Sequence, residues 1–271
     1  MSPDVGYRLL AVDSETRLEQ FGPRTVDRPS PGATATVAAL DPGADLHYRR
    51  SSGWSGSTDP WHLEWRDLRL ELRPTPTGQV GLFPEHATMW SWLSERLLER
   101  PGASVLNLFA YTGASSLHLA RQGARVTHVD ASRPAVSWAR RNAALSGLAG
   151  APVRWLVDDA EAFVEREVRR HRTYDGIILD PPTYGHGSGG RTWQLDDGLD
   201  PLLIRCARLT TARPGFVLLT AHTPGWDGAR LEAVLARRFG PGRSESGPLE
   251  LRAEDGSVLP LGAWAWLIMA P

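Results

Sequence analysis

The chain has 271 residues, of which 41% are hydrophobic and 23% charged, and its formal net charge is −1. A single cysteine excludes an internal disulfide framework, and the lack of a Cys/His spacing pattern argues against structural zinc. No run of about 18 apolar residues and no N-terminal signal segment is present, so we expect a soluble cytoplasmic protein that does not enter a membrane.

Basic composition neither favours nor excludes a nucleic-acid partner. All 30 basic residues are arginine. Arginine forks suit phosphate recognition, but a GC-rich coding sequence explains the same bias more simply. A net charge near zero gives no global attraction to nucleic acid, whereas a local basic patch still could.

The first 60 residues are rich in Pro, Gly, Ser and Asp, with short apolar pieces between them. We predict a small β-rich extension over residues 1–84 that precedes a larger domain over residues 85–271. Trp54, Trp61 and Trp65 could stack on bases, but large aromatic side chains in a small β-rich segment more often form its core.

A strand and a helix are predicted next. Residues 68–73 alternate apolar and charged side chains, which predicts a strand with one wet face. Residues 74–78 form a turn, and residues 79–83 are predicted to return as the second strand of a hairpin. An amphipathic helix is expected over residues 85–100, ended by Pro101 and Gly102.

The most informative segment is residues 105–116, an apolar strand that runs through a tight turn into the start of a helix. A dinucleotide site needs several glycines in such a turn, and a P-loop needs a Gly-Lys-Ser/Thr ending. This turn has one glycine, Gly113, and no lysine. A nucleoside cofactor without phosphates, such as S-adenosylmethionine, needs the backbone to come close to it at only one position, together with the exposed amides at the start of the helix.

Acidic residues follow the next three predicted strands. Asp130 ends the strand at residues 125–130, 17 positions after Gly113, where a carboxylate could accept both ribose hydroxyls. Asp159 follows residues 153–157, with Ala160 beside it, and would lie near the adenine. Asp180 follows residues 176–179, where the substrate would meet the methyl group. Ligands bind beyond the carboxyl ends of strands in open α/β sheets, so these acids are expected to meet.

Strands and helices alternate from residue 104 onwards, which predicts a doubly wound α/β fold with a mostly parallel sheet. Helices are expected over residues 134–146, 160–171 and 199–211, and Cys206 in the last of these is expected to be a buried side chain. Residues 216–220 form another strand. Residues 249–270, interrupted at Asp255 and Gly256, form a closing hairpin.

These motifs together resemble the class I S-adenosylmethionine-dependent methyltransferases, and more closely the group of bacterial large-subunit ribosomal RNA methyltransferases. The resemblance covers residue 80 to the C-terminus, and a less specific likeness includes residues 18–23. It implies a Rossmann-like fold with a seven-stranded sheet, S-adenosylmethionine as the cofactor, and no metal. Carried over position by position, the cofactor-binding residues would be Phe109, Tyr111, Thr112, Gly113, Asp130, Ala131, Asp159, Ala160 and Asp180, together with Glu85 and His86 at the methionine end.

Two departures from that group concern the substrate. The segment before Trp54 does not look like the RNA-binding PUA domain that the ribosomal RNA enzymes usually carry. Members that methylate carbon 5 of cytosine use a cysteine nucleophile, and Cys206 is the only cysteine here.

The catalytic residues are predicted to be Asp180, Pro181, Pro182 and Tyr184. Two prolines stiffen the turn and remove amide hydrogens, which leaves carbonyls and a carboxylate as acceptors for an incoming N–H. Tyr184 either stacks on the target base or packs in its loop. The glycine-rich residues 185–193 could form a lid, and His186 could act as a base, although a lone loop histidine is more often simply solvated.

The leading interpretation is a methyltransferase that modifies a base in RNA, most plausibly ribosomal RNA. One alternative is a methyltransferase of a small molecule or protein. Another is a non-catalytic module that binds S-adenosylmethionine. A nicotinamide dehydrogenase is disfavoured by the missing glycines. The sequence does not indicate an oligomeric state.

Overall fold

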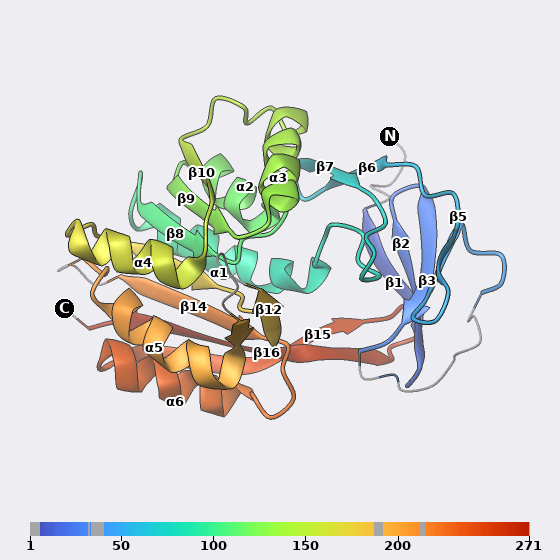
Figure 1. The fold of residues 1–271 in the computed structure, drawn as a ribbon. Helices are drawn as coiled ribbons and strands as arrows, with labels where there is room; N and C mark the ends of the chain where they lie inside the picture. Colours follow the sequence, from blue (N-terminus) through green and yellow to red (C-terminus); the bar gives the residue numbers. More distant parts are fainter. Residues whose placement is uncertain (1–5, 32, 34–40, 187–191, 212–214, 271) are drawn as a thin grey trace.

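A seven-stranded sheet forms the centre of the larger part of the molecule (Figure 1). The computed structural model describes residues 6–31, 33, 41–186, 192–211 and 215–270. Five neighbouring strands are parallel, β16 runs antiparallel to β14, and β15 runs antiparallel to β16 at the edge of the sheet. The spatial order is β10 (Val153–Val157), β9 (Arg125–Asp130), β8 (Ser104–Leu108), β11 (Gly176–Leu179), β14 (Phe216–Ala221), β16 (Val258–Met269) and β15 (Gly242–Arg252). The predicted doubly wound, mostly parallel sheet is confirmed.

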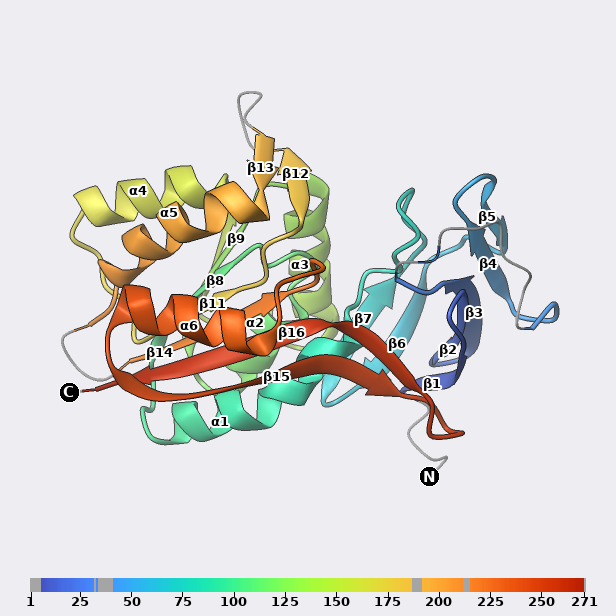
Figure 2. The same cartoon turned by 90° about the horizontal axis from the view of Figure 1, so that it is seen from below.

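Helices cover both faces of this sheet, as Figure 2 shows from below. One face carries α1 (Trp90–Leu98), α2 (Ala114–Arg121) and α3 (Arg133–Leu145), and the other carries α4 (Ala160–Arg169), α5 (Leu195–Ala207) and α6 (Gly228–Phe239). Successive strand residues alternate between two separate cores. Val105 and Ile178 belong to one core, and Leu106 and Ile177 belong to the other. This alternation explains why the strands are apolar along their whole length.

The N-terminal part forms a second sheet of five strands. Its order is β1 (Tyr7–Val12), β2 (Thr16–Phe21), β3 (Arg24–Pro29), β4 (Leu46–Arg49) and β5 (Gly53–Gly56). A hairpin follows, formed by β6 (Trp61–Trp65) and β7 (Leu68–Leu72). The strand at residues 68–72 was predicted, but its antiparallel partner lies before it. Residues 79–83 form no strand, although Arg73 N–H donates to the Val80 carbonyl at 3.0 Å.

The two sheets share apolar packing. One core runs from Phe21 in β2 through Leu63 in β6 to Trp90 in α1. The β15–β16 hairpin reaches the N-terminal sheet, where Glu254 N–H donates to the Leu9 carbonyl at 3.1 Å. The N-terminal sheet is therefore fixed against the seven-stranded sheet by apolar packing and by this backbone hydrogen bond.

Two predicted helices begin elsewhere than expected. The segment at residues 85–100 starts as a 3₁₀ helix, η1 (Pro84–Met89), and only then becomes α1. The apolar periodicity that favours an α-helix begins at Met89, which explains the late start. The helix α5 begins at Leu195, ahead of the predicted residue 199, because it follows directly on the small hairpin of β12 (Tyr184–His186) and β13 (Thr192–Gln194).

The structure also tests the expected burial of Cys206 and the expectation that no helix spans a membrane. Cys206 is fully buried in α5, as predicted, and burial raises the pKa of its thiol. In the part of the chain that the structure describes, every helix is too short or too polar to span a bilayer.

Candidate active site

A cavity of about 660 Å³ lies at the carboxyl ends of the parallel strands, and the N-terminal sheet also contributes to its walls. The acidic residues predicted to meet do meet here, since Asp130, Asp159 and Asp180 all line it. Its other lining residues include Phe83, Glu85, Phe109, Tyr111, Ala131, Ala160, Pro181, Pro182, Trp193 and His222, together with Arg17, Glu19 and Arg28 from the N-terminal sheet.

The turn after β8 has an unusual backbone. Phe109 and Tyr111 have φ angles of 57° and 49°, in the left-handed region that side chains rarely adopt. Gly113 has a φ of 88° and precedes the first turn of α2. A Cβ on Gly113 would lie 2.9 Å from the Cβ of Ala139, so α3 packs directly on this position. Strained turns of this kind concentrate at ligand sites.

Asp130 is held by backbone amides at the end of β9. Tyr111 N–H donates to one carboxylate oxygen at 2.8 Å, and Ser132 N–H donates to the other at 2.8 Å. Burial raises the pKa of Asp130, and these two amides oppose that rise. Each oxygen keeps a lone pair, so the carboxylate can accept further hydrogen bonds from a ligand in the cavity.

Asp159 and Asp158 have structural partners as well as cavity positions. Asp159 caps α4 by accepting from Ala162 N–H at 3.0 Å. Asp158 pairs with Arg166. Ala160 is buried at the first position of α4 and offers an apolar contact beside these two acids.

Asp180 lies between two histidines. His86 Nε2 is 3.3 Å from one carboxylate oxygen, and His222 Nε2 is 3.2 Å from the other. The Thr220 hydroxyl also donates to Asp180. Although burial raises the pKa of this carboxyl, the charges of His86 and His222 hold it well below its usual range.

The surroundings of His222 favour its doubly protonated form. Its Nδ1 lies 2.6 Å from the Leu261 carbonyl, and a carbonyl only accepts, so Nδ1 carries a proton. Its Nε2 faces the ionised Asp180, which also only accepts. Burial lowers the pKa of His222, but Asp180 raises it by more, to about 9.

These same three side chains are the one set, within the described residues, that could present metal ligands together. Their ligand atoms lie within 4.8 Å of one another. Both Nε2 atoms already contact the Asp180 oxygens. We therefore describe the set as an ion-paired triad, which we call the His–Asp–His triad.

Four of the sequence-predicted site residues lie outside the main cavity. Thr112, Gly113 and His86 line a smaller neighbouring hollow of about 50 Å³. The Thr112 hydroxyl donates to the Gly81 carbonyl at 2.6 Å, which ties the turn to the segment before η1. Tyr184 is 54% exposed and does not line the cavity.

The predicted lid and base lie largely outside the described residues. Residues 187–191 belong to the undescribed part of the chain, and only the backbone of His186 is described, in β12. Trp193, at the other end of that segment, lines the cavity with its ring 5.2 Å from Phe109. Its indole N–H donates to the Pro182 carbonyl at 2.8 Å, so that predicted acceptor already has a partner.

Several site residues escaped the sequence-based prediction. His222 follows the end of β14, so the same rule that identified the acids could have identified it. Trp193 depends on a hairpin that was not predicted. Arg17, Glu19 and Arg28 lie in the N-terminal sheet, and only the tertiary structure brings them to the cavity.

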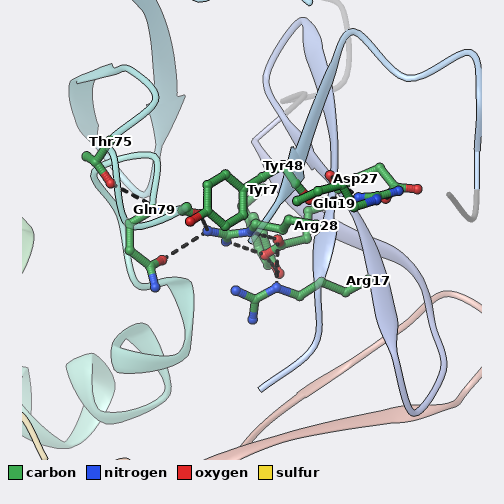
Figure 3. Close-up of polar contacts among 10 residues, drawn as sticks. Tyr7, Arg17, Glu19, Asp27, Arg28, Tyr48, Thr75 and Gln79 are labelled. Carbon is green, nitrogen blue, oxygen red and sulfur yellow. Dashed lines mark hydrogen bonds and ion pairs between the residues drawn. The ribbon is translucent and has the colours of Figure 1, made fainter. Parts of the chain in front are cut away.

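The N-terminal wall of the cavity is a buried charge cluster, shown in Figure 3. Arg28 donates to both oxygens of Glu19, at 2.5 and 3.1 Å, and to the side chain of Gln79 at 3.0 Å. The Tyr7 hydroxyl donates to Glu19 at 3.0 Å. Arg17 Nε is 3.2 Å from Glu19.

Comparison with known proteins agrees with this geometry. A family model described as conserved hypothetical protein 95 matches residues 70–189. A relative from Syntrophotalea carbinolica, named ribosomal RNA large subunit methyltransferase K/L, is 38% identical over 180 residues, which are 62% of this chain and 24% of that protein. A relative of the same name from Hahella chejuensis is 37% identical over 166 residues, 59% of this chain and 21% of that protein. The chain thus spans at most about a quarter of these curated relatives.

Solved structures match over the whole chain. A putative methyltransferase complexed with SAH superimposes with a TM-score of 0.80 at 16% identity, covering 98% of this chain and 76% of that one, which supports the fold. A SAM-dependent methyltransferase from Agrobacterium tumefaciens superimposes with a TM-score of 0.89 at 33% identity, covering 100% of this chain and 92% of that one. Because that match extends across both sheets, the chain belongs to the S-adenosylmethionine-dependent methyltransferases.

Proposed function

We propose that this protein transfers the methyl group of S-adenosylmethionine to a base in RNA. The observation that carries the proposal is the shared cavity, in which Asp130, Asp159, Asp180 and His222 lie at the carboxyl ends of strands of one sheet. Across the sheet, β10, β9 and β11 present Asp159, Asp130 and Asp180 in the order adenine, ribose and reacting methyl, which is the order of these groups along the cofactor.

The cavity residues fit the nucleoside part of this cofactor. Asp130 is already oriented by two amides and would accept from the ribose hydroxyls. Asp159 would lie by the adenine amino group, with Ala160 against the ring. The single glycine of the turn and its left-handed neighbours bring the backbone close without a phosphate-binding loop.

Asp180 would stabilise positive charge on the acceptor nitrogen electrostatically and would not act as a nucleophile. The bound cofactor supplies a methyl group activated by a sulfonium, and the sulfur keeps the C–S electron pair when the acceptor nitrogen forms its new bond. Positive charge would then develop on that nitrogen, which would lose its proton to water. The Asp180 carboxylate, held ionised before the reaction begins, would accept from the N–H of that nitrogen and stabilise the developing charge.

RNA is the proposed substrate class for two reasons. Relatives named ribosomal RNA large subunit methyltransferase K/L match 44 to 62% of the chain at 33 to 38% identity. Aromatic side chains also surround the proposed methyl-transfer point, with Phe83, Phe109 and Trp193 lining the cavity, and aromatic rings stack on extruded bases.

A labelled-methyl assay tests this proposal. RNA, protein and metabolite fractions from cells that lack the gene would be incubated with the purified protein and radiolabelled cofactor. We expect label in RNA, and none with Asp180→Ala. Label found only in protein or in metabolites would contradict the RNA assignment. Cofactor binding without transfer to any fraction would instead indicate a non-catalytic module.

A further inference from the structure

Arg17 in β2 is a buried cation whose charge is not fully compensated. Its side chain is 9% exposed and lines the cavity. Within the described residues its guanidinium has one polar contact, the 3.2 Å approach of Nε to Glu19, and that Nε lacks hydrogen-bond geometry. Figure 3 shows the terminal nitrogens pointing away from the strands that carry Arg28 and Glu19. Buried guanidinium groups normally have acceptors for most of their five N–H bonds.

The neighbouring charges are already used. Two guanidinium nitrogens of Arg28 donate to Glu19, and Arg28 also donates to the Gly78 carbonyl and to the side chain of Gln79. Glu19 receives the Tyr7 hydroxyl as well. Arg28 and Glu19 therefore form a nearly neutral, saturated pair. Arg17 adds a positive charge beside that pair, and burial and Arg28 together lower its pKa.

A carboxylate lies across the same cavity. Glu85, in η1, is buried and lines the cavity, and its charge favours the protonated form of Arg17. The cavity therefore presents one guanidinium and one carboxylate at this end, both largely removed from water. A free α-amino acid group, with its carboxylate and ammonium, has the complementary pair of charges.

We infer that Arg17 binds the α-carboxylate at the amino-acid end of the cofactor, while Glu85 faces its α-ammonium. The inference rests on the proposed function and extends it, because it places a cofactor-binding residue in the N-terminal sheet. The N-terminal sheet then completes the cofactor site, whatever it does with the substrate.

The charges of the cavity wall also indicate whether Arg17 binds a phosphate of the RNA backbone or the carboxylate of the cofactor. A phosphate of the RNA backbone would bring a second anion beside the buried Glu85 carboxylate, because Arg28 already neutralises Glu19 and leaves only Arg17 for the new charge. A zwitterion brings its own ammonium for the second carboxylate. The depth of Arg17 favours the same choice, since backbone phosphates are normally contacted by side chains that reach solvent.

The test compares three ligands by calorimetry on the full chain. They are S-adenosylhomocysteine, its decarboxylated analogue, and 5′-methylthioadenosine, which lacks the whole amino-acid end. Wild-type protein should prefer S-adenosylhomocysteine to the decarboxylated analogue by about 10- to 100-fold, the range of one charge-assisted contact. Arg17→Gln should remove most of that preference and leave the affinity for 5′-methylthioadenosine unchanged. Arg17→Lys should restore part of it.

Arg8→Gln is the matched control. Arg8 lies in the same sheet, is about half exposed, pairs with Glu254, and does not line the cavity, so its loss should change no affinity. Retained binding of 5′-methylthioadenosine by Arg17→Gln also shows that the variant is folded.

Three outcomes would contradict the inference in different ways. Equal weakening of S-adenosylhomocysteine and its decarboxylated analogue by Arg17→Gln would show that Arg17 does not contact the carboxylate. An unchanged ligand preference with a raised KM for RNA would assign Arg17 to a phosphate of the substrate. Failure of wild-type protein to bind any of the three ligands would overturn the proposed function itself.

Discussion

Several side chains that line this cavity also stabilise the local structure around it. Asp159 caps a helix, Asp130 fixes a turn, and Asp180 joins His86 to His222. A substitution at such a residue changes both binding and local structure. Predictions at this scale therefore need a readout that separates the two.

Asp130→Ala should weaken the binding of S-adenosylhomocysteine by about 2 to 3 kcal/mol, because it removes a charged acceptor of two hydroxyls. Calorimetry measures the loss, with Asp200→Ala in α5, which pairs with Arg237 of α6 and does not line the cavity, as the control. Unchanged affinity in Asp130→Ala would disprove the ribose assignment.

The charge of His222 should depend on Asp180. With the carboxylate present, the pKa of His222 is raised to about 9, so the imidazolium persists through neutral pH. In Asp180→Asn the largest raising influence is lost, and only the Glu85 charge and the Leu261 carbonyl still oppose burial, so the pKa should fall well below 9. An NMR titration of the imidazole protons measures both values. Similar pKa values in the two proteins would rule out the ion-paired triad.

The same shift makes stability depend on pH. A raised folded-state pKa stabilises the fold fully below about 6.5, and this contribution disappears as pH rises through about 9. His222→Gln should therefore be less stable than wild type at pH 6 and should approach it near pH 10. Urea unfolding across that range provides the check, and a constant difference would count against the assignment.

Cys206→Ser should retain methyl transfer, since the thiol is fully buried in α5 and burial raises its pKa. Some loss of stability is expected because a hydroxyl replaces an apolar contact. The assay compares turnover per folded molecule. A folded but inactive variant would reopen the question of a covalent mechanism.

Helix α2 is bounded by two glycines that the chain needs for different reasons. Gly113 precedes it with a φ of 88°, and Gly123 follows it with a φ of 85°. A Cβ on Gly113 would contact Ala139 at 2.9 Å, whereas a Cβ on Gly123 would meet nothing within 4 Å. Alanine substitutions at Gly113 and Gly123 therefore distinguish the free-energy cost of backbone strain plus steric overlap from that of backbone strain alone.

Gly113→Ala should destabilise the protein by about 2 to 4 kcal/mol, from strain and overpacking together. Gly123→Ala should cost about 1 kcal/mol, from strain alone. Denaturant unfolding gives both values. Equal losses would mean that α3 moves aside at no cost.

Elements with strong local patterns were predictable from sequence. The bounds of β9 agree with the prediction. The strands β10, β11 and β14 lie where apolar runs end in polar residues, and β8 lies where an apolar run enters the predicted turn. Partners of distant segments were not predictable. The sequence pattern of residues 68–73 identifies a strand but does not say which neighbour pairs with it, and nothing local in residues 16–21 indicates that Arg17 reaches a cavity built mainly by residues after 80. Long-range packing decides both.

At the scale of the whole molecule, the two sheets depend on a common apolar core. That core contains Phe21, Leu63 and Trp90, from the N-terminal sheet, the β6–β7 hairpin and α1. The division into an extension over residues 1–84 and a methyltransferase domain over residues 85–271 stays a prediction about organisation. The shared core leads us to expect cooperative unfolding.

Leu63→Ala should cost about 2 to 5 kcal/mol, because the side chain is fully buried in that core. We expect one transition in which far-UV circular dichroism and cofactor binding are lost together. Leu98→Ala, at a site that is 76% exposed, should change stability by less than about 0.5 kcal/mol. Two separate transitions would show that the sheets unfold independently.

The β15–β16 hairpin joins β14 along one edge and touches β1 at its tip. During synthesis, the edge of β14 therefore lacks its neighbour until residues 242–269 have left the ribosome. Leu261, which lines the cavity and accepts from His222, arrives in the same late segment. A nascent chain that stalls before this hairpin would hold an exposed strand and an incomplete binding site, so the cavity is complete only once residues 242–269 have folded.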